Sequence, residues 1–246
     1  MLVVNLPFSG DSKIPGAELG FQFFIKESYL EKDYFIDPDT FINMQNYDNK
    51  IIQDQVKKIV TEEIEEQRSI LFFGGTHSTT SFIFENILEN TKIPLTVFDA
   101  HIDKGDDISR YYNWNILSKI NPLISRGLVI GTRHYYDQIA NPSKFTIIDD
   151  IECQDFQKIE ELIEEFIGKN APIYVSIDLD VINSFEFPGV GFPEPGGISL
   201  VSLIGYIRKI KKISSCIIWD IVEFNPLIEK NRSVRALQRI LQEIIY

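Results

Sequence analysis

Cysteine is scarce in this chain of 246 residues, which contains only two, and basic residues are outnumbered by acidic ones. Cys153 stands in an acidic segment of helical character, and Cys216 lies inside an apolar, strand-like run. This placement argues against a disulfide framework and against a thiolate metal cage. The 24 Lys and Arg against 36 Asp and Glu leave a formal net charge of −12. Such a charge argues against nucleic acid or an anionic membrane as a partner, and it would attract small cationic substrates.

Long apolar runs are also absent from the sequence. No run approaches the roughly 20 residues of a membrane-spanning helix, and residues 1–11 lack the basic leader of a signal peptide. We therefore expect a cytoplasmic protein that does not bind membranes. A content of 44% hydrophobic and 24% charged residues is typical of a globular protein with a sizeable core.

Apolar, strand-like runs alternate with helical patterns along the whole chain. Helical patterns occupy residues 21–29, 49–67, 79–90, 155–170, 199–212 and 233–245. Strand-like runs occupy residues 1–8, 69–73, 93–103, 126–137, 144–149, 171–180 and 215–226. Residues 183–197 form a loop rich in Gly and Pro, and residues 34–50 are mixed in character. The alternation predicts a single α/β domain over residues 1–246, doubly wound around a mainly parallel sheet.

Polar clusters follow four of the apolar runs: residues 74–78 (GGTHS), 99–103 (DAHID), 176–180 (SIDLD) and 220–226 (DIVEFNP). Asp99, His101 and Asp103 alternate along the chain, so in an extended backbone their side chains project to the same side. Asp178 and Asp180 repeat this spacing. Because ligands bind at the carboxyl ends of strands in doubly wound sheets, we expect the four clusters to meet at one edge.

The gathered acids point to metal ions. Four carboxylates in one crevice would repel one another, and burying them without partners would cost several kcal/mol each, whereas two divalent cations would cancel their charge. His77 and His101, two of the three histidines in the chain, stand with these acids at strand ends. Carboxylate and imidazole without thiolate favour Mn²⁺, and the ligand types also suit Zn²⁺, Fe²⁺ or Co²⁺. Taken alone, a single Asp at a strand end is more often a helix cap or a turn residue.

The strand-end motifs resemble those of the ureohydrolase family, which comprises arginases, agmatinases and formiminoglutamases. Residues 74–78 are similar to the family's Gly-Gly-Asp-His-Ser, residues 99–103 to Asp-Ala-His-x-Asp, and residues 176–197 to Ser-x-Asp-x-Asp with its Gly/Pro loop. Residues 15–27 and 219–226 also resemble family segments. The resemblance implies a three-layer α/β/α fold of arginase type, a site for two Mn²⁺ ions per chain, and homo-oligomers of three or six chains.

The same resemblance implies a role for each polar residue of the strand ends. One ion would be held by His77, Asp99, Asp103 and Asp178, and the other by His101, Asp99, Asp178 and Asp180. Asp99 and Asp178 would bridge the ions, and a metal-bound hydroxide would attack the guanidinium or formimino carbon of a small cationic substrate. Glu223 matches the family carboxylate that pairs with the substrate's guanidinium; the alternative for Glu223 is a surface ion pair.

Several positions depart from the family pattern. Thr76 stands where the family usually has Asp, a position behind the ligands that affects metal affinity or ligand orientation. Asn183 and Ser184 replace an Asp-Pro pair, which affects the support of the following loop. Arginases and agmatinases carry a His, thought to shuttle a proton to the leaving amine, where the nearest match here is Asn113. Asparagine cannot act as a general acid at neutral pH.

His134 is a candidate to replace this shuttle, because it ends a strand-like run expected at the same edge; the alternative is a structural or substrate-contacting role. In arginases, carboxylates that read the amino-acid end of the substrate occupy the positions of His134 and Tyr136, so arginine itself is a poor candidate substrate. Tyr111, Tyr112 and Trp114 either pack the loop that holds them or form an aromatic wall for a cation.

Alternative functions therefore stay open at this stage. The first is a manganese-dependent hydrolase of linear C–N bonds in a guanidino or formimino compound, agmatinase-like or formiminoglutamase-like. The second is a metal-binding homologue with little or no activity, acting as an oligomeric binding or regulatory protein, which Asn113, Thr76 and Asn183 favour. The third is another metal-dependent amidohydrolase, such as a deacetylase-like enzyme.

Overall fold

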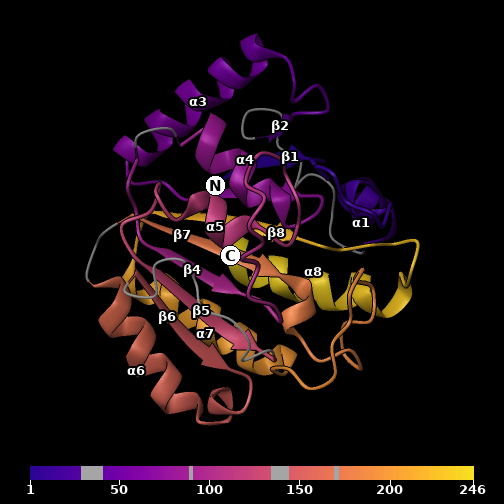
Figure 1. The fold of residues 1–246 in the computed structure, drawn as a ribbon, viewed down its shortest axis with the longest axis vertical. Helices are drawn as coiled ribbons and strands as arrows, with labels where there is room; N and C mark the ends of the chain where they lie inside the picture. The colour runs from indigo at the N-terminus through magenta and orange to yellow at the C-terminus, as the bar shows by residue number, and fades with distance from the viewer. Residues whose placement is uncertain (29–40, 89–90, 134–143, 169–171) are drawn as a thin grey trace.

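The computed structural model describes residues 1–28, 41–88, 91–133, 144–168 and 172–246. These residues form one sheet of eight strands in the order β2-β1-β3-β8-β7-β4-β5-β6, and every neighbouring pair is parallel (Figure 1). The strands are β1 (Leu2–Leu6), β2 (Phe41–Asn43), β3 (Ile70–Gly74), β4 (Leu95–Phe98), β5 (Gly127–Thr132), β6 (Phe145–Asp149), β7 (Ile173–Asp178) and β8 (Ile217–Val222).

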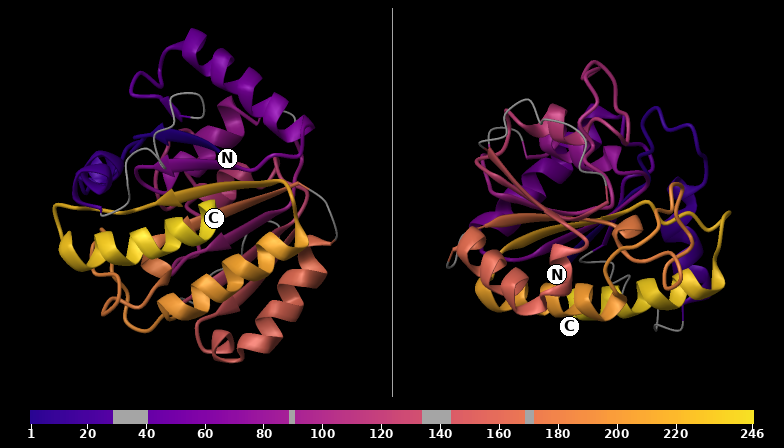
Figure 2. Two further views of the ribbon diagram at one scale, coloured as in Figure 1. Left: turned by 180° about the vertical axis from the view of Figure 1, so that it is seen from behind. Right: turned by 60° about the horizontal axis from the view of Figure 1, so that its bottom comes forward.

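Helices cover both faces of this sheet. The α-helices are α1 (Gly20–Glu27), α3 (Lys50–Glu65), α4 (Ser78–Asn86), α5 (Ile116–Ile120), α6 (Phe156–Ile167), α7 (Leu200–Ile213) and α8 (Asn231–Ile245). Short 3₁₀ turns occur at η1 (Ala17–Leu19), η3 (Glu152–Gln154) and η4 (Leu179–Val181). Helices α1, α6, α7 and α8 pack on one face and α3, α4 and α5 on the other, as the views in Figure 2 show. The expected α/β/α architecture is thus confirmed, with a sheet that is wholly parallel.

The alternation of side chains along a strand supplies both cores. In β3, Ile70 and Phe72 face the core beneath α3, α4 and α5, whereas Leu71 and Phe73 face the core on the opposite side. Every residue of β3, β4, β5, β7 and β8 is buried. Burial on both faces explains why these strands are continuous apolar runs in the sequence.

Two elements differ from the sequence-based expectation. The strand β2 lies in the segment 34–50, whose sequence is mixed, and the five-residue helix α5 follows the polar loop after residue 103. Both are too short to show a periodicity. The strand expected over residues 93–103 is also shorter in the structure. It comprises only β4 and ends at Phe98, where the polar residues begin. No helix in the described part of the chain combines the length and the apolar character needed to cross a bilayer.

The strand order places the four polar clusters together. β3 and β4 follow one another along the chain, but β8 and β7 lie between them in the sheet. The carboxyl ends of β3, β8, β7 and β4 are therefore neighbours. The helices that follow β3 and β4 pack on one face of the sheet and those that follow β7 and β8 on the other, and doubly wound sheets bind ligands in the crevice at such a point.

Candidate metal centre

Backbone hydrogen bonds shape the polar turn after β4. The carboxylate of Asp99 accepts a hydrogen bond from the backbone N–H of His101 at 2.7 Å, so the chain turns as soon as the strand ends. The carbonyl of Asp103 accepts a hydrogen bond from the N–H of Leu117 at 2.7 Å, which ties the far end of the turn to α5. Asp99, His101 and Asp103 are consequently held at fixed positions on one side of the crevice.

The end of β7 is tied to the end of β4. Asp178 accepts a hydrogen bond from the N–H of Asp180 at 3.0 Å and so caps η4. Asp180 in turn accepts one from the N–H of Ala100 at 3.1 Å. Each of these carboxylates keeps a second oxygen directed toward the crevice, where the contacts below are found.

The turn after β3 brings His77 to the same place. A Cβ on Gly74 would lie 2.8 Å from the side chains of Thr79 and Val222, so only glycine lets this turn pack against β8. The N–H of His77 donates to Glu223 Oε1 at 2.8 Å, which joins the end of β3 to the residue after β8.

The six residues expected as ligands form two groups in the structure. Nδ1 of His77 lies 3.1 Å from Asp99 Oδ2, 3.1 Å from Asp103 Oδ2 and 3.2 Å from Asp178 Oδ2. Nδ1 of His101 lies 3.0 Å from Asp180 Oδ2 and 3.5 Å from Asp99 Oδ1. Asp99 therefore contributes one oxygen to each group, and each group has the composition of a metal site.

Burial makes this arrangement costly for the protein by itself. Burial raises the pKa of Asp178 well above its usual value, and the charges of Asp180 and Asp99 add to that effect. Burial and the charge of Asp99 likewise raise the pKa of Asp103 to about 7. For His77, burial opposes the charged form, but the surrounding carboxylates outweigh it and raise the pKa of the imidazole well above its usual value. A divalent cation would relieve the repulsion among these close acidic groups, which have too little positive charge around them.

One buried atom tests the fit of a metal directly. Nδ1 of His77 is buried, yet it forms no hydrogen bond of acceptable geometry with any described residue, although three carboxylate oxygens surround it. A proton on Nδ1 could serve at most one of these oxygens well, whereas a cation can accept lone pairs from the nitrogen and the oxygens together. The residues present fit a divalent metal.

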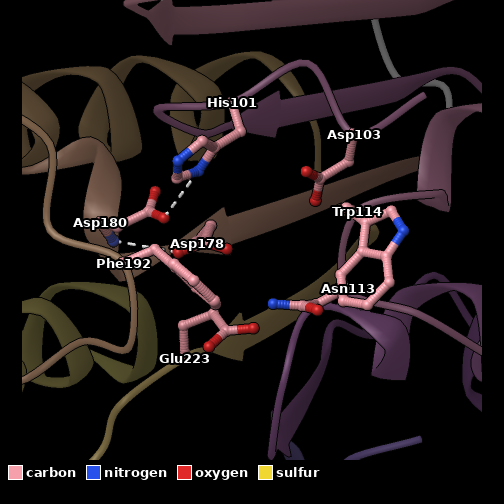
Figure 3. A pocket seen from close by; sticks show the side chains of 8 residues that line it. All are labelled: His101, Asp103, Asn113, Trp114, Asp178, Asp180, Phe192 and Glu223. Carbon is pink, nitrogen blue, oxygen red and sulfur yellow. Dashed lines mark hydrogen bonds and ion pairs between the residues drawn. The ribbon is translucent and has the colours of Figure 1, made fainter. Parts of the chain in front are cut away.

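A pocket of about 280 Å³ opens in front of these groups. Figure 3 shows the side chains that line it: His101, Asp103, Asn113, Trp114, Asp178, Asp180, Phe192 and Glu223. The ligand candidates form its floor, and the rings of Trp114 and Phe192 form apolar walls. The volume and the lining suit a small molecule with a polar end and an apolar or flexible tail.

Glu223 is held in an unusual conformation at this pocket. Its φ of 69° lies in the left-handed region that favours glycine, and its N–H is fixed by the carbonyl of Gly75 at 2.8 Å. Burial raises the pKa of its carboxyl to about 7, and the N–H of His77 opposes that shift. Strain of this kind persists where the surroundings impose it, typically at functional sites.

The positions that depart from the family pattern have identifiable partners. The hydroxyl of Thr76 lies 2.7 Å from that of Ser78, and both residues are buried. Asn183 donates to Glu186 Oε2 at 2.5 Å and accepts from the N–H of Glu186 at 3.1 Å, so it supports the loop that follows. Asn113 lines the pocket as expected for the position of a shuttle, and its Oδ1 has no hydrogen-bond partner among the described residues.

The remaining candidates divide into packing residues, pocket residues and residues outside the described part. Tyr111 packs against Phe8 and donates a hydrogen bond to Glu85 at 2.5 Å, which is loop packing. Trp114 stacks on Tyr112 with ring centroids 4.4 Å apart and forms part of the pocket wall. His134, proposed from the sequence as a substitute shuttle, and Tyr136 lie outside the described residues.

Two residues near the pocket were not predicted from the sequence. Phe192 forms a wall, and Glu194 Oε1 lies 3.6 Å from Nε2 of His101. Both belong to the loop 183–197. An aromatic and an acid placed among Gly and Pro are the signal that could have identified them, because connecting loops commonly carry binding residues.

Asp178→Asn should stabilise the chain in the absence of metal. A folded-state pKa above the unfolded one means that ionisation near pH 7 opposes folding, and the neutral amide can still accept the N–H of Asp180. We expect a gain of about 1 kcal/mol, which raises the melting temperature by about 2–4 °C. Thermal unfolding followed by circular dichroism in EDTA measures the shift. The gain should shrink near pH 4, where the wild-type carboxyl is protonated in the folded state. A variant that melts below the wild type at both pH values would show that ionisation of Asp178 does not oppose folding.

Comparison with known proteins gives a consistent result. The model of the Arginase family matches residues 1–246. The chain is 27% identical over 242 residues to the agmatinase of Pyrococcus horikoshii, covering 90% of this chain and 82% of the relative. It is 32% identical over 175 residues to the formimidoylglutamase of Photorhabdus laumondii, covering 65% of this chain and 55% of the relative. The structure of proclavaminate amidino hydrolase from Streptomyces clavuligerus has the same fold, with a TM-score of 0.78 and 23% identity over 100% of this chain and 90% of that one.

Proposed function

The chain belongs to the arginase family, whose hydrolases act on C–N bonds of amidino compounds, and from this membership we propose that it is a metal-dependent hydrolase of a small guanidino compound. The observation that carries the proposal is the pair of histidine–carboxylate groups joined by Asp99 at the floor of the pocket. We also propose that residues 1–246 form a single domain.

The two groups would hold two divalent ions, and Mn²⁺ is the first choice for oxygen and imidazole donors. His77 and Asp103 would serve one ion and His101 and Asp180 the other. Asp99 and Asp178 would serve both, as the family resemblance implies, and Asp99 is the one with a contact to each histidine among the described residues. A bound pair of such ions lowers the pKa of water and supplies a nucleophile at neutral pH. The hydrogen bonds of Asp178 and Asp180 to backbone N–H groups hold one oxygen of each carboxylate and leave the other for the metal. In Asp99, Oδ1 accepts the N–H of His101 and would use its second lone pair for one ion, while Oδ2 would serve the other.

Glu223 would bind the cationic end of the substrate. Its Oε1 accepts the N–H of His77, and its carboxylate lines the pocket beside the ligand candidates. A guanidinium offers parallel N–H donors to a carboxylate, so the pair would orient the central carbon toward the metal centre. The hydrogen bond from the N–H of His77 holds this carboxylate, and the backbone of Glu223 is itself fixed by the carbonyl of Gly75.

The residues that line the walls of the pocket indicate the charge of the substrate's tail. Among the described residues that line the pocket there is no Lys or Arg to pair with a carboxylate, and the walls are the rings of Trp114 and Phe192. We therefore favour a guanidino compound with a neutral or cationic tail, of the agmatine type, over arginine.

One observation favours a second candidate. The ammonium of Lys13 lies 5.3 Å from the centroid of the Trp114 ring, and Trp114 is one of the residues that line the pocket. A cation there could meet a carboxylate at the mouth of the pocket, which suits a formimino amino acid such as formiminoglutamate. The likeness to a formimidoylglutamase supports keeping this class.

A substrate screen tests the proposal. The full chain, stripped with EDTA and reloaded with Mn²⁺, is incubated with agmatine, arginine, guanidinobutyrate, formiminoglutamate and an acetylated diamine. Urea, formamide, ammonia and acetate are then measured. We expect metal-dependent urea release from a guanidino compound without a carboxylate, and none from the EDTA-treated control.

Each other outcome assigns a different function. Formamide or ammonia from formiminoglutamate supports the second candidate, and acetate supports a deacetylase-like enzyme. Binding of two Mn²⁺ ions without turnover across the panel supports a metal-binding homologue with a regulatory or structural role. A chain that binds no Mn²⁺ overturns all of these. The trimer or hexamer implied by the family resemblance belongs to the same proposal, and light scattering measures it against the chain mass of 28.4 kDa.

A further inference from the structure

A buried carboxylate lies behind the metal centre, away from the pocket. Asp220 in β8 is completely buried and accepts three hydrogen bonds from hydroxyls: from Tyr174 at 2.5 Å, Ser176 at 2.6 Å and Thr80 at 2.7 Å. Ser176, also fully buried, lies 3.1 Å from Nε2 of His77. A chain of polar contacts therefore runs from Asp220 through Ser176 to His77.

The direction of each hydrogen bond in this chain follows from the number of protons. A carboxylate only accepts, and each hydroxyl has a single proton to donate. The protons of Ser176 and Thr80 are both committed to Asp220, so the 3.2 Å contact between these two hydroxyls carries no proton of its own. The oxygen of Ser176 is left as an acceptor, and the ring N–H that it faces is that of His77 Nε2.

We propose that Asp220 is a positioning residue that sets the tautomer of His77. Through Ser176 it holds the ring proton on Nε2, so that Nδ1 presents a lone pair to the three carboxylates that would share a metal ion with it. The inference rests on the proposed function, because it concerns the metal centre of that function. It explains why an acid stands in the middle of the otherwise apolar strand β8, where burial of an unpartnered charge would be costly.

Asp220→Asn tests the idea with little change in shape. The amide oxygen can still accept hydroxyl protons at one end of the group, as Oδ2 now accepts those of Tyr174 and Thr80, but the NH₂ must donate where the other oxygen accepted. If that donor faces Ser176, the serine turns its own proton toward Nε2, and His77 must carry its proton on Nδ1, where the metal would bind. In serine proteases, the same exchange behind a histidine preserves the geometry and acts through the wrong tautomer.

Mn²⁺ titration is the first measurement. For Asp220→Asn, we expect the affinity for the ion beside His77 to fall by about 10- to 100-fold, while the second ion is affected less. Tyr174→Phe is the matched control, because it removes one buried hydrogen bond from Asp220 but leaves the Ser176 and His77 contacts intact. Its Mn²⁺ affinity should stay within about threefold of the wild type. Ser176→Ala, which removes the acceptor of the Nε2 proton, should weaken the same ion and replaces Asp220→Asn if that variant does not fold.

Nitrogen-15 NMR of the ring nitrogens is the second measurement, made on Zn²⁺-loaded protein because Zn²⁺ is diamagnetic. Only three histidines have to be assigned. The wild type and Tyr174→Phe should show His77 protonated at Nε2, and Asp220→Asn should lose that signal. If Asp220→Asn and Ser176→Ala both bind Mn²⁺ like the wild type and keep the Nε2 proton, Asp220 has no positioning role. The proposed function would still stand in that case. A wild-type chain without Mn²⁺ affinity overturns the proposed function itself.

Discussion

Asp99→Asn should remove both metal ions and lower the hydrolysis rate by about 10³-fold or more. Asp99 is the residue that the two groups share, with Oδ2 3.1 Å from His77 Nδ1 and Oδ1 3.5 Å from His101 Nδ1. The amide has lost the negative charge, and only one of its two ends can offer a lone pair to a metal. Metal ions contribute several kcal/mol of charge stabilisation in a hydrolytic transition state, and each 1.4 kcal/mol corresponds to about a factor of ten in rate.

Metal content per chain, measured together with turnover, checks this result. Asp180→Asn is the matched control, because the Asp180 carboxylate belongs to the group of His101 and the amide can still accept the N–H of Ala100. We expect no ion in Asp99→Asn and one ion in Asp180→Asn. Both variants should keep the wild-type circular dichroism spectrum. Two ions bound to Asp99→Asn at wild-type affinity would contradict a shared role for Asp99.

The positions of the candidate ligands could be predicted from the sequence because short-range rules govern them. The alternation of Asp99, His101 and Asp103 follows an apolar run, and parallel strands in a doubly wound sheet present such ends on one side. The strand order then makes β3, β8, β7 and β4 adjacent. The convergence expected from the sequence is therefore confirmed, while the ligand roles stay a proposal for the metal titrations to test.

Contacts between distant segments could not be predicted in the same way. The acid Asp220 is visible in the sequence as a charge within an apolar strand, but its partners Thr80 and Tyr174 lie 140 and 46 residues away along the chain. The left-handed backbone of Glu223 has no signal either, because no glycine marks it. Such features depend on how strands and helices pack against one another, which local propensity does not determine.

The distinction between an enzyme and a metal-binding homologue depends on Asn113. This residue lines the pocket with Asp103 and Glu223, and its Oδ1 is without a hydrogen-bond partner among the described residues. A replacement would therefore break no hydrogen bond of that atom in the described part of the chain. If no other residue shuttles protons, the leaving amine of the substrate must take its proton from water.

Asn113→His should raise the turnover of the best substrate of the screen by about 10²- to 10⁴-fold, the range typical of a positioned general acid. The imidazole would also introduce a limb near pH 6–7 in the dependence of kcat on pH, since its ordinary pKa is about 6.5. Asn113→Gln is the control, because glutamine is of similar size but carries no transferable proton at neutral pH. Initial rates of product release between pH 5 and pH 9, fitted for kcat and KM separately, measure the effect.

His134→Ala, made in the wild type and in Asn113→His, separates the remaining possibilities. If the wild type uses His134 as its shuttle, the alanine variant loses activity in the wild-type background. The Asn113→His background should tolerate the same change, because the introduced imidazole can protonate the leaving amine there. If neither histidine matters and Asn113→His leaves kcat and its pH dependence unchanged in an active enzyme, protonation of the leaving group does not limit the rate. An inactive wild type that gains metal-dependent turnover through Asn113→His would identify this position as the point at which the catalytic cycle was lost while the metal centre was retained.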